Sequence, residues 1–267
     1  MTDPKENTLS LMEHLEELRD RLKRSVISII AVFIIAFCFA ERLFNILAKP
    51  LKDQMPEGGK LIFTGLPEMF FTYLKISFVA GLVGASPYIF YQFWKFVAPG
   101  LYKHEQRLML PFVFTSTFLF VGGALFGYFI VFPFGFNFFL GFSSDTVQAL
   151  PSVREYFSLS LMLLIAFGAI FELPIILFFL AKLGLVTPKF LREKRKYAIA
   201  LAFVIGAILT PPDVFTQFLM AIPMIILYEI SIFAAKFARP AKKKEGEEGE
   251  EEETSDMEDN GKEKGGE

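Results

Sequence analysis

The residues best suited to chemistry in this sequence of 267 residues are a few ionisable groups in unusual positions. Glu172 lies inside the apolar stretch from Phe167 to Pro174, and an ionisable group inside a membrane costs several kcal/mol. Its position predicts a polar partner site or a hydrated cavity, or else a protonated carboxyl group hydrogen-bonded across two helices. Lys75 is less informative, because its long side chain near one end of an apolar stretch can reach the lipid headgroups.

A second group of polar residues surrounds a proline turn near the end of the apolar region. Asp213 follows Pro211 and Pro212 directly, where a carboxylate can accept the first free N–H groups of the next helix. The alternative is that Asp213, Thr210 and Gln217 form a polar patch that holds another helix. The residues alone leave both interpretations open.

Charged residues outside the apolar stretches have ordinary explanations. Glu17 and Arg21 are four residues apart, a spacing that predicts an ion pair on a solvated helix face. Glu105 has the pattern of an ordinary loop charge. No HExxH sequence, Gly-rich phosphate loop or plausible Ser and His arrangement is present, so we predict no enzymatic activity and no cofactor. With two histidines and the single cysteine Cys38, we expect no metal site and no intrachain disulfide.

The composition indicates a lipid environment. Hydrophobic residues make up 53% of the chain and 34 residues are Phe, more than a soluble domain of this size can bury. They occur in long blocks such as Leu108 to Leu140 and Leu161 to Leu180, long enough to cross a hydrocarbon core of about 30 Å. Because every backbone polar group must be paired there, we predict an all-α, polytopic membrane protein.

Six spans are predicted, within a transmembrane domain of residues 26–238. Residues 1–25 are predicted to be a cytoplasmic segment, with an amphipathic helix from Ser10 to Arg24 at the membrane surface. This segment is too long and too acidic for a signal peptide. The fifth span has fourteen residues, too few for an ordinary bilayer, which predicts a short final hairpin. The spans cover residues 26–40, 69–96, 108–139, 155–182, 197–210 and 214–233.

The connections carry turn-forming residues. Residues 41–68 are predicted to be a loop with a strand-like piece at 61–64, because Pro50, Pro56 and two glycines interrupt them. Pro87 predicts a kink in the second span. Gly184 is expected to end a helix, and Thr187 and Pro188 to start a short surface helix.

Lys and Arg residues in the connections predict the orientation. Nineteen lie on one side of the predicted spans and five on the other. Since basic residues prefer the cytoplasmic side, both termini are expected in the cytoplasm. The tail of residues 239–267 is predicted to be disordered and cytoplasmic, because from residue 241 it holds twelve acidic residues and five lysines around a single apolar Met.

Three stretches of sequence are specific enough to indicate a particular family of membrane proteins. They are HLEELRDRL at residues 14–22, FVAPGLYKHE at residues 96–105 and LTPPD at residues 209–213. Their order and spacing resemble the HLxELRxRL, FxxPgLyxhE and LTPPD signatures of the TatC family of twin-arginine protein translocases. The resemblance covers the chain from Thr8 to Ala238.

The resemblance implies a receptor in the bacterial or archaeal cytoplasmic membrane that binds the twin-arginine signal peptides of folded proteins. Glu17 and Glu105 would each take a guanidinium in a charge-assisted, often bidentate hydrogen bond that lysine cannot reproduce. By resemblance, Arg19 and Arg21 orient this surface, and Phe96 offers an apolar contact beside it.

The resemblance also implies functional roles for residues in the spans and in the first outer loop. Pro50, Glu172 and Asp213 correspond to positions where function is sensitive in the family. The concave face near Glu172 would receive the apolar part of the signal peptide. The final hairpin, with Thr210 and Gln217, would dock TatA-like and TatB-like single-span partners in a self-associating assembly driven by the protonmotive force.

Two other classes of function fit parts of the sequence. A secondary transporter or channel would use Glu172 as its ligand, but such proteins often contain repeated halves, and no internal repeat is present. A passive membrane scaffold would tolerate charge changes at Glu17 and Glu105. No feature of the sequence indicates binding to nucleic acid.

Overall fold

The computed structural model describes residues 4–56, 59–97, 109–144, 149–211 and 213–238. Glu105 and the predicted acidic tail lie outside the described residues. The described chain is helical, and an isolated β bridge pairs Ile62 with Ser152. The helices are α1 (Pro4–Cys38), α2 (Ala40–Lys52), α3 (Glu68–Val97), α4 (Met109–Phe126), the π-helix η3 (Gly127–Val131), α5 (Phe132–Leu140), α6 (Val153–Phe171), α7 (Leu173–Lys182), α8 (Pro188–Glu193), α9 (Arg195–Leu209) and α10 (Val214–Ala235).

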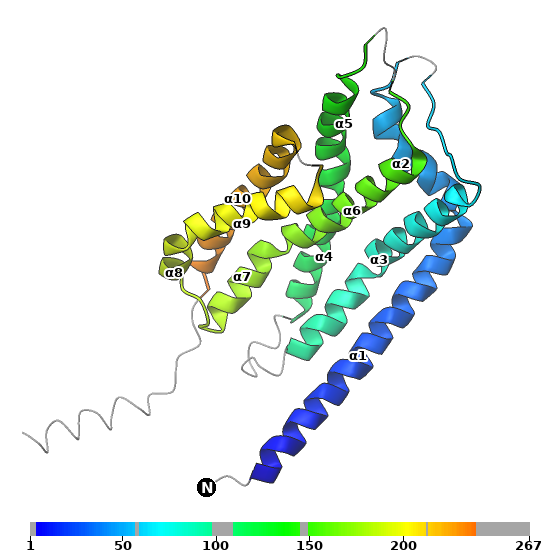
Figure 1. The fold of residues 1–267 in the computed structure, drawn as a ribbon. Helices are drawn as coiled ribbons and strands as arrows, with labels where there is room; N and C mark the ends of the chain where they lie inside the picture. The colour runs from blue at the N-terminus through cyan, green and yellow to red at the C-terminus, as the bar shows by residue number, and fades with distance from the viewer. Residues whose placement is uncertain (1–3, 57–58, 98–108, 145–148, 212, 239–267) are drawn as a thin grey trace, which may run out of the picture.

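Within the described residues these helices form six columns, which confirms the predicted all-α, polytopic fold (Figure 1). Four columns are long and apolar enough to cross a membrane: α3, α4 with η3 and α5, α6 with α7, and α10. The first column qualifies only together with α2, which bends away by 83°. The fifth, α9, has 15 residues, about 22 Å of helix, as expected for a short hairpin.

Consecutive columns run in opposite directions, so the bundle has two distinct ends (Figure 1). We call the end that carries α2 and the bridge between Ile62 and Ser152 the α2 end, and the opposite one the terminal end. The first helix starts and the last helix finishes at the terminal end. An even number of spans therefore places both ends of the helical bundle on the same side.

The first helix differs from the expected two-part arrangement. The predicted amphipathic segment and the predicted first span form one helix, α1, without a break at residue 25. It packs along α3 (Figure 1). The amphipathic residues therefore continue the axis of the first span.

The predicted loop of residues 41–68 contains a helix that the sequence interpretation missed. In α2, Ala48, Pro50 and Leu51 are buried while Ile46 is exposed, the pattern of a helix lying on an apolar surface. Pro50 argued against a helix, but near its C-terminal end it removes only one intrahelical hydrogen bond. The predicted strand-like piece at 61–64 forms only the bridge at Ile62.

Two interruptions in the other columns were also missed. Span three changes from α-helix to π-helix at Gly127 and back at Phe132. Span four is broken at Glu172, just before Pro174. Helix α3, in contrast, continues through Pro87, because the Ser86 hydroxyl donates at 2.7 Å to the Val83 carbonyl that the proline leaves free.

Helix ends that were predicted from capping residues are confirmed. Gly184 has a φ of 76° just after α7, a conformation that costs glycine little. The Thr187 hydroxyl accepts from Phe190 N–H at 3.1 Å, and Asp213 accepts from Thr216 N–H at 2.7 Å. Asp213 is thus the N-cap of α10.

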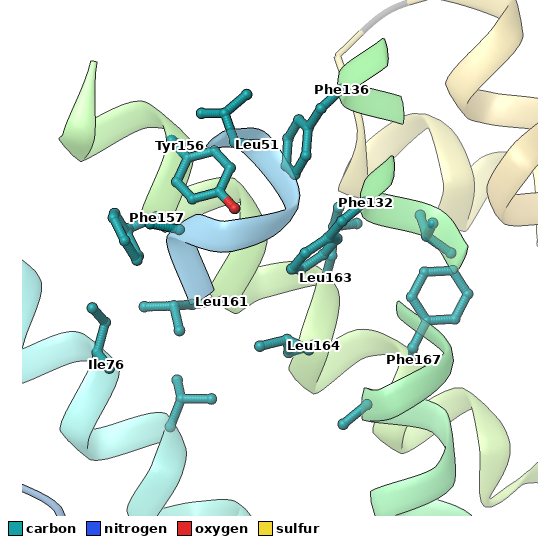
Figure 2. Packing of buried hydrophobic residues seen from close by; sticks show 14 of the residues in the cluster. Leu51, Ile76, Phe132, Phe136, Tyr156, Phe157, Leu161, Leu163, Leu164 and Phe167 are labelled. Carbon is teal, nitrogen blue, oxygen red and sulfur yellow. The ribbon is translucent and has the colours of Figure 1, made fainter. Parts of the chain in front are cut away.

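The main core lies toward the α2 end, where α2, α3, η3, α5 and α6 meet (Figure 2). Phe132, Phe157 and Phe167 are buried in it, and Leu51 reaches it from α2. Aromatic contacts include Phe136 with Tyr156, whose ring centroids are 4.9 Å apart. This packing holds the missed helix α2 against the ends of the spans.

Glu68 connects the two segments that join spans at the α2 end. Its side chain is buried, and its carboxylate accepts from the N–H groups of Thr64 (3.0 Å), Gly65 (3.2 Å) and Arg154 (2.8 Å), and from the Ser152 hydroxyl (3.3 Å). Ser152 is the N-cap of α6 by position but makes no capping hydrogen bond itself. A carboxylate from α3 therefore caps α6 and fixes the turn before α3.

Candidate functional site

The first candidate site lies at the terminal end, where α1 passes the last turn of α3. Arg21 donates to Glu17 Oε1 from Nε at 3.0 Å and also from Nη2, which confirms the predicted ion pair. The Arg21 side chain is 13% exposed and that of Glu17 37% exposed. The pair is thus partly buried, and Arg21 holds one oxygen of a carboxylate whose other oxygen remains available.

An aromatic stack borders the free side of this carboxylate. The rings of His14 and Phe96 are stacked with centroids 4.5 Å apart and an interplanar angle of 21°. His14 Nδ1 lies 3.9 Å from Glu17 Oε2. Phe96 is therefore brought to Glu17 through His14, a connection between α1 and α3 that sequence interpretation did not identify. Both residues stand in the motifs noted above, but no spacing rule relates positions 14 and 96.

Arg21 also keeps Glu17 ionised. The hydrogen bond from Arg21 lowers the pKa of the Glu17 carboxyl below its usual value of 4.5, against the opposing effect of burial, and the charge of Arg21 lowers it further. Lys95, on α3, contributes a smaller attraction. The site thus offers a persistent negative charge beside an aromatic surface, which suits a guanidinium that can bond and stack at once.

The structure places Arg19 apart from this pair. Its side chain is 58% exposed, and its Nε lies 3.4 Å from Asp20 Oδ1. Glu105 lies outside the described residues, so its distance from Glu17 stays a prediction. Of the five residues expected on this surface, Glu17, Arg21 and Phe96 gather within one cluster.

The second candidate site is Glu172, at the break between α6 and α7. It is 7% exposed, and one carboxyl oxygen, Oε1, has no hydrogen-bond partner among the described residues. The Ser116 hydroxyl of α4 lies beside this carboxyl group, and Ser116 accepts from the Trp94 indole N–H of α3 at 3.0 Å. Glu172 thus combines a polar neighbour on another helix with an unused acceptor.

Apolar grooves flank Glu172 along α4. One groove of about 340 Å³ is lined by Pro174, Phe178 and Phe112 among others, and a second of about 340 Å³ by Phe171, Phe118 and Phe129 among others. Phe171, directly before Glu172 in sequence, lines the second groove, and Pro174, two residues after it, lines the first. An extended apolar segment or a helix could lie there.

The polar residues of the final hairpin are used within the hairpin. The Thr210 hydroxyl donates to the Gly206 carbonyl at 2.9 Å, and Gln217 Nε2 donates to the Phe203 carbonyl at 3.1 Å. Asp213 caps α10 and bonds the Thr216 hydroxyl as well. The surface that the hairpin presents outward is apolar, with Ile208 and Val214 each 70% exposed.

Pro50 has a structural effect that depends on its missing N–H. It leaves the Ile46 carbonyl without its helical donor, and the Tyr128 hydroxyl of η3 donates to that carbonyl at 2.8 Å. Next to it, the Tyr156 hydroxyl of α6 donates to the Leu47 carbonyl at 2.5 Å. The proline therefore creates an attachment point that ties α2 to the π-helix of span three.

No group of His, Cys, Asp and Glu residues in the described ranges could hold a metal ion. The arrangement as described is one of binding surfaces: a carboxylate held by an arginine beside an aromatic stack at the terminal end, a buried carboxyl group near apolar grooves, and an apolar hairpin.

Comparison with known proteins extends these observations. The profile of the family described as Sec-independent protein translocase protein (TatC) matches residues 13–223. A protein of that name from Desulforapulum autotrophicum is 56% identical over 92% of this chain and 90% of its own, and one from Escherichia coli K12 is 42% identical over 87% and 90%. Two crystal structures described as twin arginine translocase receptor TatC, at 49% and 48% identity, have TM-scores of 0.76 and 0.78, covering 84% of this chain and 99% and 100% of theirs.

Proposed function

Because this chain belongs to the TatC family, a multi-pass membrane component of the Sec-independent protein translocase rather than an enzyme, we propose that it is the receptor for twin-arginine signal peptides. The observation that carries the proposal is the Glu17 carboxylate, anchored by Arg21 beside the stack of His14 on Phe96. The membrane is the bacterial or archaeal cytoplasmic membrane, and the terminal end faces the cytoplasm, in line with its excess of Lys and Arg.

Recognition uses the free side of the carboxylate. An arginine of the signal peptide donates to Glu17 Oε2, while Arg21 retains Oε1 and holds the carboxylate in place. The second arginine is taken by Glu105. A lysine would lack the planar pair of donors and the flat face that can lie on an aromatic ring.

The apolar part of the signal peptide then follows the grooves beside Glu172. Their walls are mostly Phe, Leu, Ile and Pro side chains, which suit an apolar segment.

A photoreactive signal peptide tests the receptor function. A twin-arginine peptide should crosslink to the wild-type protein in membranes, a twin-lysine peptide should not, and the crosslink should vanish in Glu105→Ala. Equal crosslinking by both peptides to both proteins would mean that the motifs at the terminal end are structural and that the receptor proposal is wrong.

The hairpin of α9 and α10 is proposed to dock TatA-like and TatB-like single-span partners in an assembly of several copies, driven by the protonmotive force. Its exposed apolar surface and its length of 15 residues in α9 support this role, because a short hairpin favours a locally thinned bilayer. Since its polar side chains are used internally, Thr210, Asp213 and Gln217 act by shaping the hairpin.

Cysteine crosslinking tests the docking surface. In a Cys38→Ser background, needed because Cys38 is exposed, Ile208→Cys should form a disulfide with a single cysteine in the partner's helix. Phe114→Cys, on α4 and 73% exposed, is the matched control and should not. Crosslinks of equal yield from both positions would contradict docking at the hairpin.

A further inference from the structure

Lys75 is the one basic residue that lies more than one turn from either end in the four columns long enough to cross a membrane. In the four columns long enough to cross a membrane, the other basic residues, Lys95, Arg154 and Lys182, lie within the first or last turn. Lys75 is about 10 Å of helix from the start of α3. From there its long side chain can reach the headgroup level of the leaflet at the α2 end, where an anionic group can meet it.

A groove between α3 and α6 surrounds the Lys75 side chain. Its volume is about 500 Å³. Lys75 Nζ donates to the Ser158 hydroxyl of α6 at 3.3 Å, and both side chains are exposed. The two residues therefore present an ammonium and a hydroxyl group together, a pair that can both donate to a phosphate oxygen. The remaining walls are Phe33, Leu74, Phe78, Val79, Leu161, Met162 and Ile165.

The polar residues of this groove lie nearer the α2 end than most of its apolar residues. Ser158 lies about 8 Å from the start of α6 at the α2 end. Met162 and Ile165 follow deeper in the membrane on the same helix, and Phe78 and Val79 do so on α3. The groove is thus charged toward the headgroups and apolar toward the midplane, the order of the parts of a phospholipid in that leaflet.

We propose that this groove binds an acidic phospholipid of the leaflet at the α2 end. Lys75 and Ser158 hold its phosphate, and one acyl chain lies along Phe78, Met162 and Ile165. A partner helix is the less suitable occupant, because it would have to pair Lys75 with a carboxylate of its own, whereas phospholipid is present around every copy of the protein. This site is independent of the proposed receptor function, since it uses none of the residues assigned to it.

Native mass spectrometry of the purified full-length protein tests the site. With phosphatidylglycerol and phosphatidylcholine of the same acyl chains as probes, the wild type should retain phosphatidylglycerol preferentially. Lys75→Gln should weaken that binding roughly tenfold, the effect of losing one charged hydrogen bond. Lys60→Gln, which removes a charge at the same end outside the groove, should bind like the wild type. Equal retention in wild type and Lys75→Gln would overturn the proposal.

Two further variants keep the test decisive if Lys75→Gln folds poorly. Lys75→Arg preserves the charge and should retain phosphatidylglycerol, whereas Met162→Trp fills the apolar part of the groove and should lose it. Unchanged binding in Met162→Trp would contradict the acyl-chain position. A benzophenone at position 78 in native membranes should trap lipid, and trapping of a protein helix instead would overturn the proposal in favour of a partner helix.

Discussion

Glu17→Gln is expected to weaken binding of a twin-arginine peptide roughly tenfold to a hundredfold, the effect of losing a charge-assisted hydrogen bond. The neighbouring change Glu16→Gln removes the same charge from an exposed position of the same helix and should have little effect. Binding of a fluorescent peptide to the purified protein measures both, and thermal unfolding confirms that both variants are folded. Equal affinities in the two variants would contradict a specific role for Glu17.

A double variant separates the effect of losing the Glu17 carboxylate on peptide binding from the effect of leaving Arg21 unpaired. In Glu17→Gln, Arg21 loses its main hydrogen-bond acceptor and becomes a cation that repels the peptide. Glu17→Gln combined with Arg21→Gln removes that cation, and peptide binding should remain weak because the carboxylate is still missing. Recovery of binding in the double variant would show that the unmasked charge of Arg21, rather than the missing carboxylate, caused the loss.

The lowered pKa of Glu17 adds a pH dependence of known sign. A carboxyl group with a lowered pKa in the folded protein keeps its charge as the pH falls below its ordinary value, and loses it only when the pH reaches the lowered value. Peptide binding to the wild type should therefore persist in mildly acidic solution. In Arg21→Gln the hydrogen bond that lowers the pKa is absent, so any remaining binding should decline at a higher pH than in the wild type.

Gly123→Ala is expected to destabilise the folded protein by about 1–3 kcal/mol, the usual cost of overpacking. A Cβ atom on Gly123 of α4 would lie 2.4 Å from the carbonyl oxygen of Phe167 and 2.9 Å from its carbonyl carbon. Both atoms belong to the backbone of α6 and cannot turn away as a side chain could. The two helices would have to separate next to the buried ring of Phe167.

The adjacent glycine provides the control for this prediction. A Cβ atom on Gly122 would have no heavy atom within 4 Å, so Gly122→Ala should preserve or slightly raise stability through the better helix propensity of Ala. Thermal unfolding in detergent, followed by tryptophan fluorescence, compares the two variants with the wild type. Melting temperatures that fall equally in both variants would contradict the close approach of α4 to α6.

The close contact of α4 with α6 uses small residues on both helices. Gly123 and Gly127 are four residues apart on α4 and its continuation, and Phe167 packs against both positions. On α6, Gly168 leaves room for the Phe120 ring, 2.8 Å from where a Cβ atom would lie. Small residues at this spacing are typical of helices that approach closely in membranes. This signal was present in the sequence, but it does not say which helix is the partner.

Sequence by itself determined the features that depend on neighbouring residues. Long apolar stretches require helices in lipid, so α3 and α10 lie close to their predicted positions. Thr187 and Gly184 were identified as helix-end residues because capping acts over only three or four residues. For Asp213 the sequence left the cap and the polar patch open, and the structure shows the cap. The family motifs likewise lie in short continuous stretches, which is why the family could be identified from them.

Only the tertiary structure decided the contacts between residues far apart in the chain. Helix α2 is held by packing against the spans and by the Tyr128 and Tyr156 hydroxyl groups, so its own sequence, with Pro50, did not indicate a stable helix. The break at Glu172 and the position of Ser116 beside it depend on how α4 meets α6 and α7.

In the candidate receptor site, too, one contact was predictable from the sequence and another required the tertiary structure. The spacing of Glu17 and Arg21 on one helix predicted their ion pair, because one turn of helix brings them together. The stack of His14 on Phe96 requires α1 and α3 to pack along their length, and no local pattern encodes that distance. The sequence therefore determined which groups are available, and the packing of the helices decided which of them meet.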